Sequence, residues 1–140
     1  LNEYDRLYLV ELAIKDEPKL QASNIEFSLP RPSYTIDTLT YLSEKYPQHQ
    51  FSVIIGSDSL QNFPYWKNYE QIIKHYSLYV YRRPGHIIKN TFDADITVLA
   101  APLLDISSTL IRQMIREGKS IRYLVPDAVA EYITANHYYK

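Results

Sequence analysis

The sequence lacks cysteine, is balanced in charge and contains no long apolar run. Zero cysteines among 140 residues exclude disulfides, thiolate metal sites and a cysteine nucleophile, and are compatible with the cytoplasm. No apolar segment approaches the roughly 20 residues of a membrane-spanning helix, and no signal peptide is visible, so a soluble protein is expected. With 15 basic against 16 acidic residues, the chain has no overall charge to attract nucleic acid or an anionic membrane.

Glycine is also scarce, with 3 residues where average usage would give roughly ten. A complete dinucleotide-binding domain usually has a glycine-rich turn after its first strand, and none occurs here. The chain begins with Leu1, already inside a helical pattern. We therefore expect a single domain over residues 1–140 that is incomplete at its N-terminus. The four histidines are too scattered for a metal-ligand spacing, so no metal site built from protein side chains is expected.

Short apolar segments alternate with helical patterns along the chain. Apolar periodicity and end signals predict helices over residues 1–15, 35–46, 70–76, 107–117 and 127–136, with a short helical turn after Gly56. Strands are predicted over residues 20–29, 51–55, 78–81 and 97–100. Segment 51–55 is almost wholly apolar, as in a strand covered on both faces of a parallel sheet. This order predicts an α/β domain with a mostly parallel sheet and ligands at the carboxyl ends of the strands.

Residues 105–112 join hydroxyl side chains to an arginine at the start of a helix. Ser107, Ser108 and Thr109 lie where the helix begins, and Arg112 follows within one turn. Free backbone N–H groups, the positive end of the helix dipole, hydroxyls and a guanidinium together suit a phosphate group. Ordinary N-capping with a solvated arginine is the alternative explanation of the same residues.

Polar residues also follow two of the predicted strands. Gly56 would let a ligand approach the backbone, and the Asp58 carboxylate would accept hydrogen bonds from two ribose hydroxyls. A turn or capping role for Asp58 is the alternative. Arg82 and Arg83 follow the next strand, where an arginine either reaches a phosphate or forms part of a solvated surface.

The single tryptophan, Trp66, lies in an aromatic stretch over residues 63–69 that we expect to be a loop. Its indole would stack on a planar ligand, and a pyridinium would add a cation–π energy of about 1 kcal/mol; core packing is the alternative. Residues 33–35 precede a helix, and the first N–H groups of that helix would hold a carboxylate or a phosphate. Simple capping of the helix is the alternative. Together these signals predict a nucleotide site in which Arg112, Asp58 and Trp66 share one crevice.

Six motifs resemble, in order and spacing, those of the bacterial nicotinate-nucleotide adenylyltransferase family. They are Pro32-Ser33-Tyr34-Thr35, Gly56-Ser57-Asp58-Ser59-Leu60, Phe63-Pro64-Tyr65-Trp66, Arg82-Arg83-Pro84-Gly85, Ile106-Ser107-Ser108-Thr109 with Ile111-Arg112, and Tyr123-Leu124-Val125-Pro126. The resemblance covers essentially the whole chain and implies a Rossmann-like nucleotidyltransferase fold. It also implies an enzyme of NAD biosynthesis that joins ATP and nicotinate mononucleotide into deamido-NAD and pyrophosphate, with Mg²⁺ bound through the substrate phosphates.

The resemblance implies a role for particular residues. The ATP-binding residues would be Gly56, Asp58, Ile106, Ser107, Ser108, Thr109 and Arg112, with Arg112 also catalytic. The residues binding nicotinate mononucleotide would be Tyr34, Thr35, Trp66, Lys67 and Arg83, with the backbone of Thr35 and Lys67 meeting the carboxylate. No general base is needed, because in-line phosphoryl chemistry depends on alignment and charge neutralisation.

The sequence departs from the family in one respect. Family members carry, before the point where this chain begins, a first strand and a His-x-Gly-His motif that is absent here. We therefore expect this chain by itself to be inactive. A non-catalytic nucleotide-binding or regulatory module is a second hypothesis, and a phosphopantetheine adenylyltransferase is a third that leaves Trp66 without a role. A homo-oligomer is an open alternative to a monomer.

Overall fold

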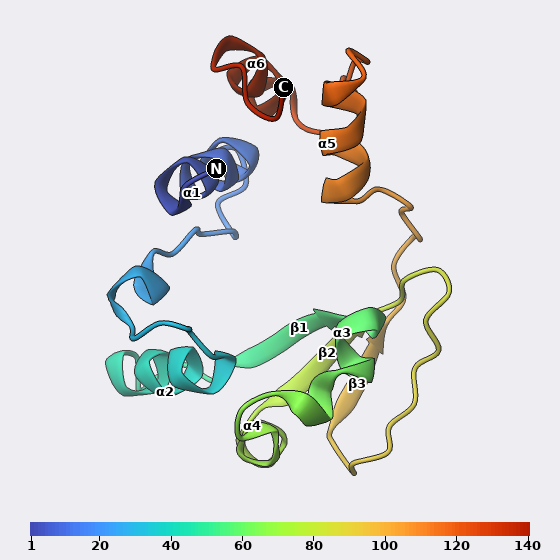
Figure 1. Ribbon diagram of the computed structural model, residues 1–140. Helices are drawn as coiled ribbons and strands as arrows, with labels where there is room; N and C mark the ends of the chain where they lie inside the picture. The colour runs from blue at the N-terminus through green and yellow to red at the C-terminus, as the bar shows by residue number, and fades with distance from the viewer. The chain divides into compact units, whose positions relative to one another are not determined.

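The computed structural model describes all of residues 1–140, which form two compact units. Unit 1 consists of residues 1–24 and 106–140, and unit 2 consists of residues 25–105. Figure 1 follows the chain by colour from its N-terminus to its C-terminus. Each unit has an apolar core of its own, and the single domain over residues 1–140 stays a prediction.

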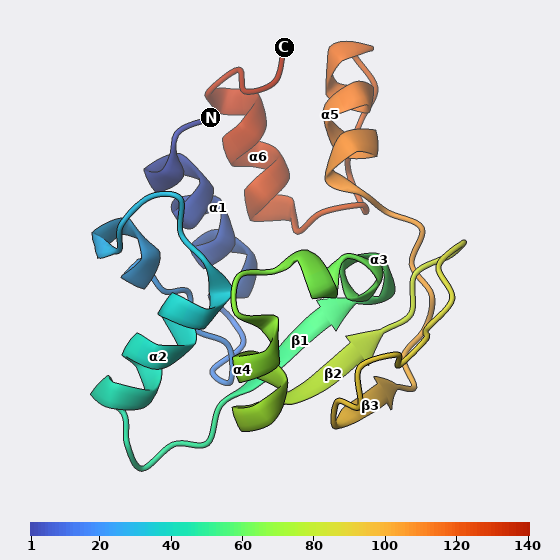
Figure 2. The ribbon, with the colours of Figure 1, turned by 60° about the horizontal axis from the view of Figure 1, so that its bottom comes forward.

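Unit 2 is built on a parallel sheet of three strands (Figure 2). The strands are β1 (Ser52–Gly56), β2 (Ser77–Tyr81) and β3 (Ile96–Leu99), in the order β1-β2-β3. The register pairs Gly56 with Tyr81 and Tyr81 with Leu99, so the three carboxyl ends lie along one edge of the sheet. The predicted α/β architecture with a parallel sheet is confirmed, and the three strands begin and end within one residue of the predicted bounds.

The helices of unit 2 pack on one face of this sheet. They are α2 (Thr35–Lys45), α3 (Ser57–Gln61), the 3-10 helix η2 (Phe63–Tyr65) and α4 (Tyr69–His75). Leu39, Leu60 and Ile72 are buried from α2, α3 and α4 against Leu78 and Val80 of β2. Each such side chain stabilises the fold by about 1.5–3 kcal/mol when fully buried.

The other face of β1 is different. Ile55 is buried, whereas Ile54 is 71% exposed, because neighbouring side chains along a strand point to opposite faces. Within unit 2 the strand is therefore covered on one face only, against the prediction of cover on both.

No strand forms over residues 20–29, so this prediction is wrong. The segment contains the 3-10 helix η1 (Ile25–Ser28), and its groups make local hydrogen bonds. Leu20 N donates to Glu17 O at 3.0 Å, and Leu29 N donates to Glu26 O at 3.3 Å. An alternating apolar pattern becomes a strand only where a neighbouring strand accepts its backbone hydrogen bonds, and here nearby residues along the chain accept them.

Unit 1 is helical and consists of α1 (Glu3–Ile14), α5 (Ser108–Arg116) and α6 (Asp127–Ala135). Its core is formed by Ile111, Ile121, Val129 and Ile133. The rings of Tyr8 and Tyr132 meet at 4.8 Å between α1 and α6. None of the helices has the length and apolar character needed to cross a membrane.

The predicted stop of α5 at Gly118 is confirmed. Gly118 has a φ of +68°, a left-handed conformation that favours glycine. Its N–H donates to Ile115 O at 3.0 Å, and the N–H of Lys119 donates to Met114 O at 2.8 Å. This is the Schellman arrangement, which satisfies the last carbonyls of the helix.

Tyr138, which follows α6, is half-buried and makes the stability of unit 1 sensitive to alkaline pH. Burial first, and then hydrogen bonding with Asp5 and Tyr132, raises the pKa of Tyr138 from 10.0 to about 12. The folded state thus favours the neutral phenol, and its contribution to stability is complete below pH 10.0 and is lost as the pH rises towards about 12. We expect the melting temperature of Tyr138→Phe, measured by circular dichroism, to fall less than that of the wild type between pH 10.0 and about 12.

Tyr123→Phe is the matched control, because Tyr123 is 86% exposed. The melting temperature of this variant should fall with rising pH as much as that of the wild type. An unchanged pH profile for Tyr138→Phe would contradict the expected role of Tyr138.

Candidate functional site

The turns after β1 and β2 are tied together at the carboxyl edge of the sheet in unit 2. The backbone N–H of Arg83 donates to Ser57 Oγ at 2.8 Å, and Ser57 is fully buried. Arg83 Nε lies 3.4 Å from Asp58 Oδ1. Arg83 is thereby held by its backbone and its side chain beside the start of α3. The structure brings together the predicted residues Gly56, Asp58 and Arg83.

Gly56 is required at this turn by close packing rather than by its backbone angles. Its φ of −77° and ψ of 156° are open to most residues. A Cβ at this position, however, would overlap with Asp58 Oδ1 and would lie 3.0 Å from Arg83 Nε. The space above the glycine backbone, which we predicted to admit a ligand, holds the Asp58 carboxylate.

The Asp58 carboxylate has one oxygen that lacks a hydrogen-bond donor. Asp58 Oδ1 is buried and accepts no hydrogen bond, although the side chain as a whole is 41% exposed. Because Oδ1 is buried beside Arg83, a donor on a ligand would meet the exposed part of the carboxylate. The guanidinium of Arg83 alongside supplies a positive charge for an anionic part of the same ligand.

A second group of predicted residues meets at the start of α2, also in unit 2. Lys67 Nζ lies 4.6 Å from the ring centroid of Tyr34 and 3.0 Å from Asp37 Oδ2. Tyr34 is the N-cap residue of α2, but its side chain makes no capping hydrogen bond. The first N–H groups of α2, beginning with Thr35, are therefore suited to an acceptor from a ligand.

Trp66 ends η2 and is half-buried. Its ring centroid lies 5.0 Å from that of Phe63, which is fully buried. The aromatic stretch is therefore an ordered 3-10 turn that Phe63 anchors in the core, and the loop prediction is wrong over Phe63–Tyr65. Core packing accounts for part of the indole, and the part that stays exposed can still contact a flat ligand.

In unit 1, the start of α5 borders a cavity of about 310 Å³. Ser107, Ser108 and Arg112 form its polar wall. The apolar wall is formed by Leu9, Ile106, Ile111, Leu124, Val125, Ile133 and Tyr139. Four of the five residues predicted around the ATP phosphates, including Ile106, thus line one hollow at a helix N-terminus.

The hydroxyls of this segment have separate tasks. Ser107 Oγ accepts from Leu110 N at 3.2 Å, which confirms that Ser107 caps α5. Thr109 does not line the cavity, and its hydroxyl accepts a hydrogen bond from Arg112 Nη2 at 3.3 Å. Thr109 therefore contacts the arginine, while Ser107 and Ser108 face the hollow.

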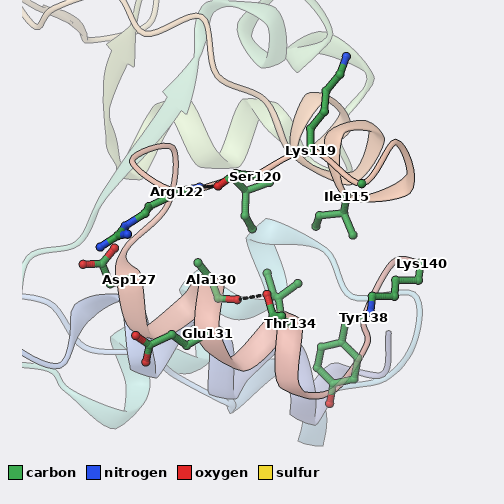
Figure 3. A pocket seen from close by; sticks show the side chains of 13 residues that line it. Ile115, Lys119, Ser120, Arg122, Asp127, Ala130, Glu131, Thr134, Tyr138 and Lys140 are labelled. Carbon is green, nitrogen blue, oxygen red and sulfur yellow. Dashed lines mark hydrogen bonds between the residues drawn. The ribbon is translucent and has the colours of Figure 1, made fainter.

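Another cavity of unit 1, of about 430 Å³, contains none of the predicted residues (Figure 3). Of its three cationic side chains, Lys119 lies 2.6 Å from Glu117, Lys140 lies 2.9 Å from His137, and Arg122 lies 5.4 Å from the centre of the Tyr123 ring. The Thr134 hydroxyl donates to Ala130 O, as the dashed line shows. Lys119 also lowers the pKa of Glu117. Because the acids Asp127 and Glu131 also line this cavity, it suits an anion less well than the cavity at the start of α5.

Two residues with a place in these groups were not singled out from the sequence. Ser57 anchors Arg83, and its only signal was its position between Gly56 and Asp58. Asp37 holds Lys67, and an acidic residue in the first turn of a helix is too common to indicate a role. The crevice predicted to join Arg112 with Asp58 and Trp66 stays a prediction, since Arg112 belongs to the other unit.

The comparisons with known proteins agree with the motifs. Residues 1–114 match a family model described as cytidylyltransferase-like. A protein of Cytophaga hutchinsonii, named probable nicotinate-nucleotide adenylyltransferase, is 55% identical over 142 residues, which cover 99% of this chain and 73% of the relative. A protein of Flavobacterium johnsoniae with the same name is 46% identical, over 100% of this chain and 74% of the relative.

Solved structures share the fold. Plasmodium falciparum nicotinic acid mononucleotide adenylyltransferase complexed with APC aligns with a TM-score of 0.80 at 19% identity, over 99% of this chain and 76% of that one. The same enzyme complexed with NaAD gives a TM-score of 0.78 at 17% identity, over 99% and 75%. The expected Rossmann-like nucleotidyltransferase fold is thereby confirmed.

Proposed function

Because the chain belongs to the nicotinate-nucleotide adenylyltransferase family, we propose that the groups described above bind and align the two substrates of that family's reaction. The reaction transfers the adenylyl group of ATP to nicotinate mononucleotide and releases deamido-NAD and pyrophosphate. The observation that carries the assignment of residues is the partly exposed pair of Asp58 and Arg83 at the carboxyl edge of a parallel sheet.

ATP is proposed to bind its ribose at Asp58, with Gly56 leaving room for the Asp58 carboxylate. A ribose hydroxyl would donate to the exposed part of the Asp58 carboxylate, whose buried oxygen Oδ1 lies 3.4 Å from Arg83 Nε. The triphosphate would use Ile106, Ser107, Ser108, Thr109 and Arg112. Support for this comes from the cavity at the start of α5, which is lined by the hydroxyl residues Ser107 and Ser108 and by Arg112.

Nicotinate mononucleotide is proposed to use the group around the start of α2. The N–H of Thr35 and the backbone of Lys67 would receive the ring carboxylate, with Tyr34 beside them. Trp66 would stack on the pyridinium, and Arg83 would contact the mononucleotide phosphate. Arg83 suits a phosphate because its side chain is 47% exposed while its backbone is anchored by Ser57.

The chemistry asks the protein for alignment more than for covalent work. A phosphate oxygen of the mononucleotide attacks the α-phosphorus of ATP, a new P–O bond forms, and the bond to the β-phosphate breaks with its electron pair leaving on pyrophosphate. The attacking oxygen is already anionic, so no proton has to be removed. Arg112 and the start of α5 would neutralise the negative charge that accumulates on the leaving phosphates.

We propose that a divalent ion, Mg²⁺, is bound by the substrate rather than by a protein cage. Mg²⁺ in such enzymes is commonly held by substrate phosphates with few protein carboxylates. The groups that would face the phosphates are hydroxyls, N–H groups and the Arg112 guanidinium, which suit a phosphate rather than a metal ion. When bound, the ion would supply charge neutralisation on the phosphates. We also propose that the reaction takes place in the cytoplasm, which the absence of cysteine accommodates.

Substitution of Trp66 tests the placement of the nicotinate ring. We expect Trp66→Ala in the full-length gene product to raise the KM for nicotinate mononucleotide by about tenfold, since stacking on an aromatic ring is worth about 1–3 kcal/mol. The KM for ATP should stay close to the wild-type value. Steady-state release of pyrophosphate, with each substrate varied in turn, measures both constants.

Tyr65→Ala is the matched control, because the neighbouring Tyr65 is 87% exposed and makes no ring contact with Phe63. It should leave both KM values unchanged, and Trp66→Phe should recover most of the loss. If Trp66→Ala raises both KM values equally and lowers the melting temperature, Trp66 serves to pack the core, and the proposal that the nicotinate ring stacks on its indole is wrong.

A further inference from the structure

Asp37 occupies a position that opposes the proposed use of the α2 N-terminus. It is the third residue of α2, and its side chain is 42% exposed. A negative side chain in the first turn is favourable for the helix itself. It would, however, repel a ligand carboxylate received by the N–H groups of the same turn.

Lys67 cancels this charge. Its ammonium lies 3.0 Å from Asp37 Oδ2 and 3.4 Å from Asp37 Oδ1, so it contacts both carboxylate oxygens. The same ammonium lies 4.6 Å from the centre of the Tyr34 ring, which lies next to the first residue of α2. Asp37 and Tyr34 thus hold one cation between them at the helix start.

The pair also joins two distant parts of unit 2. Asp37 and Lys67 are 30 residues apart, and Lys67 directly follows Trp66. The ion pair therefore fixes the segment that carries the indole relative to the first turn of α2. A pair that served only as a surface contact would contribute about 0–1 kcal/mol to folding and would not distinguish between ligands.

We propose that the Lys67 ammonium preserves a preference of this site for a ring carboxylate over an uncharged amide, because it neutralises the Asp37 carboxylate at the start of α2. This inference rests on the proposed function of the same site. Asp37 therefore leaves the binding of nicotinate mononucleotide unweakened only while Lys67 is paired with it. An unpaired Asp37 penalises nicotinate mononucleotide and leaves nicotinamide mononucleotide unaffected.

The test compares kcat/KM for the two mononucleotides in the full-length gene product. Lys67→Ala should lower the acid-to-amide ratio of kcat/KM by about fivefold or more, the scale of an exposed charge interaction near 1 kcal/mol. The double variant Asp37→Asn with Lys67→Ala should return the ratio to near the wild-type value. Asp37→Asn alone removes the repelling charge and keeps the Lys67 ammonium, so it should not lower the ratio.

Glu44→Gln is the control, because Glu44 is an exposed acid at the far end of the same helix, and it should leave the ratio unchanged. Melting temperatures and the KM for ATP report on folding in every variant. Equal losses with both mononucleotides in Lys67→Ala, or no recovery in the double variant, would overturn the role of Asp37. If the wild-type protein fails to use nicotinate mononucleotide, the proposed function itself is wrong and the inference is lost with it.

Discussion

Gly56→Ala is expected to lower kcat/KM for ATP by about 100-fold, the scale of an active-site displacement near 1 Å. The added Cβ would overlap with Asp58 Oδ1 and crowd Arg83 Nε at 3.0 Å. The overlapping atom is the end of a side chain, so the carboxylate can rotate away and the fold should survive. The proposed ribose acceptor would then be lost from its place beside the sheet. Pyrophosphate release with ATP varied measures the effect.

Gly118→Ala should produce the opposite pattern and serves as the control. Gly118 has a positive φ, but no atom lies within 4 Å of its added Cβ. Strain at such a position costs about 1–3 kcal/mol, so the melting temperature should fall while kcat/KM is retained. A Gly56→Ala enzyme with wild-type kcat/KM would show that the Asp58 carboxylate need not stay where it lies in this structure.

Arg112→Ala is the second variant for which we expect a large effect. The guanidinium is half-buried in the wall of the cavity at the start of α5 and is oriented by Thr109. Removing a donor that stabilises developing negative charge typically lowers kcat by about 10²–10³-fold, and we expect a loss of this size. Arg112→Lys should recover part of the rate, because it keeps the charge and loses the two-pronged geometry.

Arg116→Ala is the matched control for this experiment. Arg116 lies in the last turn of the same helix, is exposed, and does not line that cavity. Its loss should leave kcat unchanged and should lower helix stability by no more than about 1 kcal/mol through the helix dipole. If Arg112→Ala and Arg116→Ala have equal activity, Arg112 does not act on the phosphates.

Periodicity in the sequence predicted most elements because each depends on residues close along the chain. The helix from Ser108 to Arg116 has its cap at Ser107 and its stop at Gly118, and all of these signals lie within a few turns. The apolar run before Gly56 likewise predicted β1 to within one residue. Residues 20–29 were assigned wrongly because the pattern of a strand does not reveal whether a neighbouring strand exists.

Some features of the candidate site could likewise be predicted from the sequence, and others could not. The phosphate-binding residues at the start of α5 could be predicted, because Ser107 is its N-cap and the i, i+4 spacing puts Ser108 and Arg112 on one face of the helix. The donor-free oxygen of Asp58 could not be predicted, since burial of a single atom depends on how distant segments pack around it. The same holds for Ser57, which the sequence presents as an ordinary turn residue.

The sequence by itself determined the family, the alternation of helices and parallel strands, and the local groups at the start of α2 and of α5. Only the tertiary structure decided that Arg83 lies over Asp58, and that Lys67 pairs with Asp37 across 30 residues. The physical reason is the range of the interactions. Capping, periodicity and turn chemistry act between near neighbours, whereas an ion pair or a buried hydrogen bond between distant residues exists only after the chain has folded and brought them together.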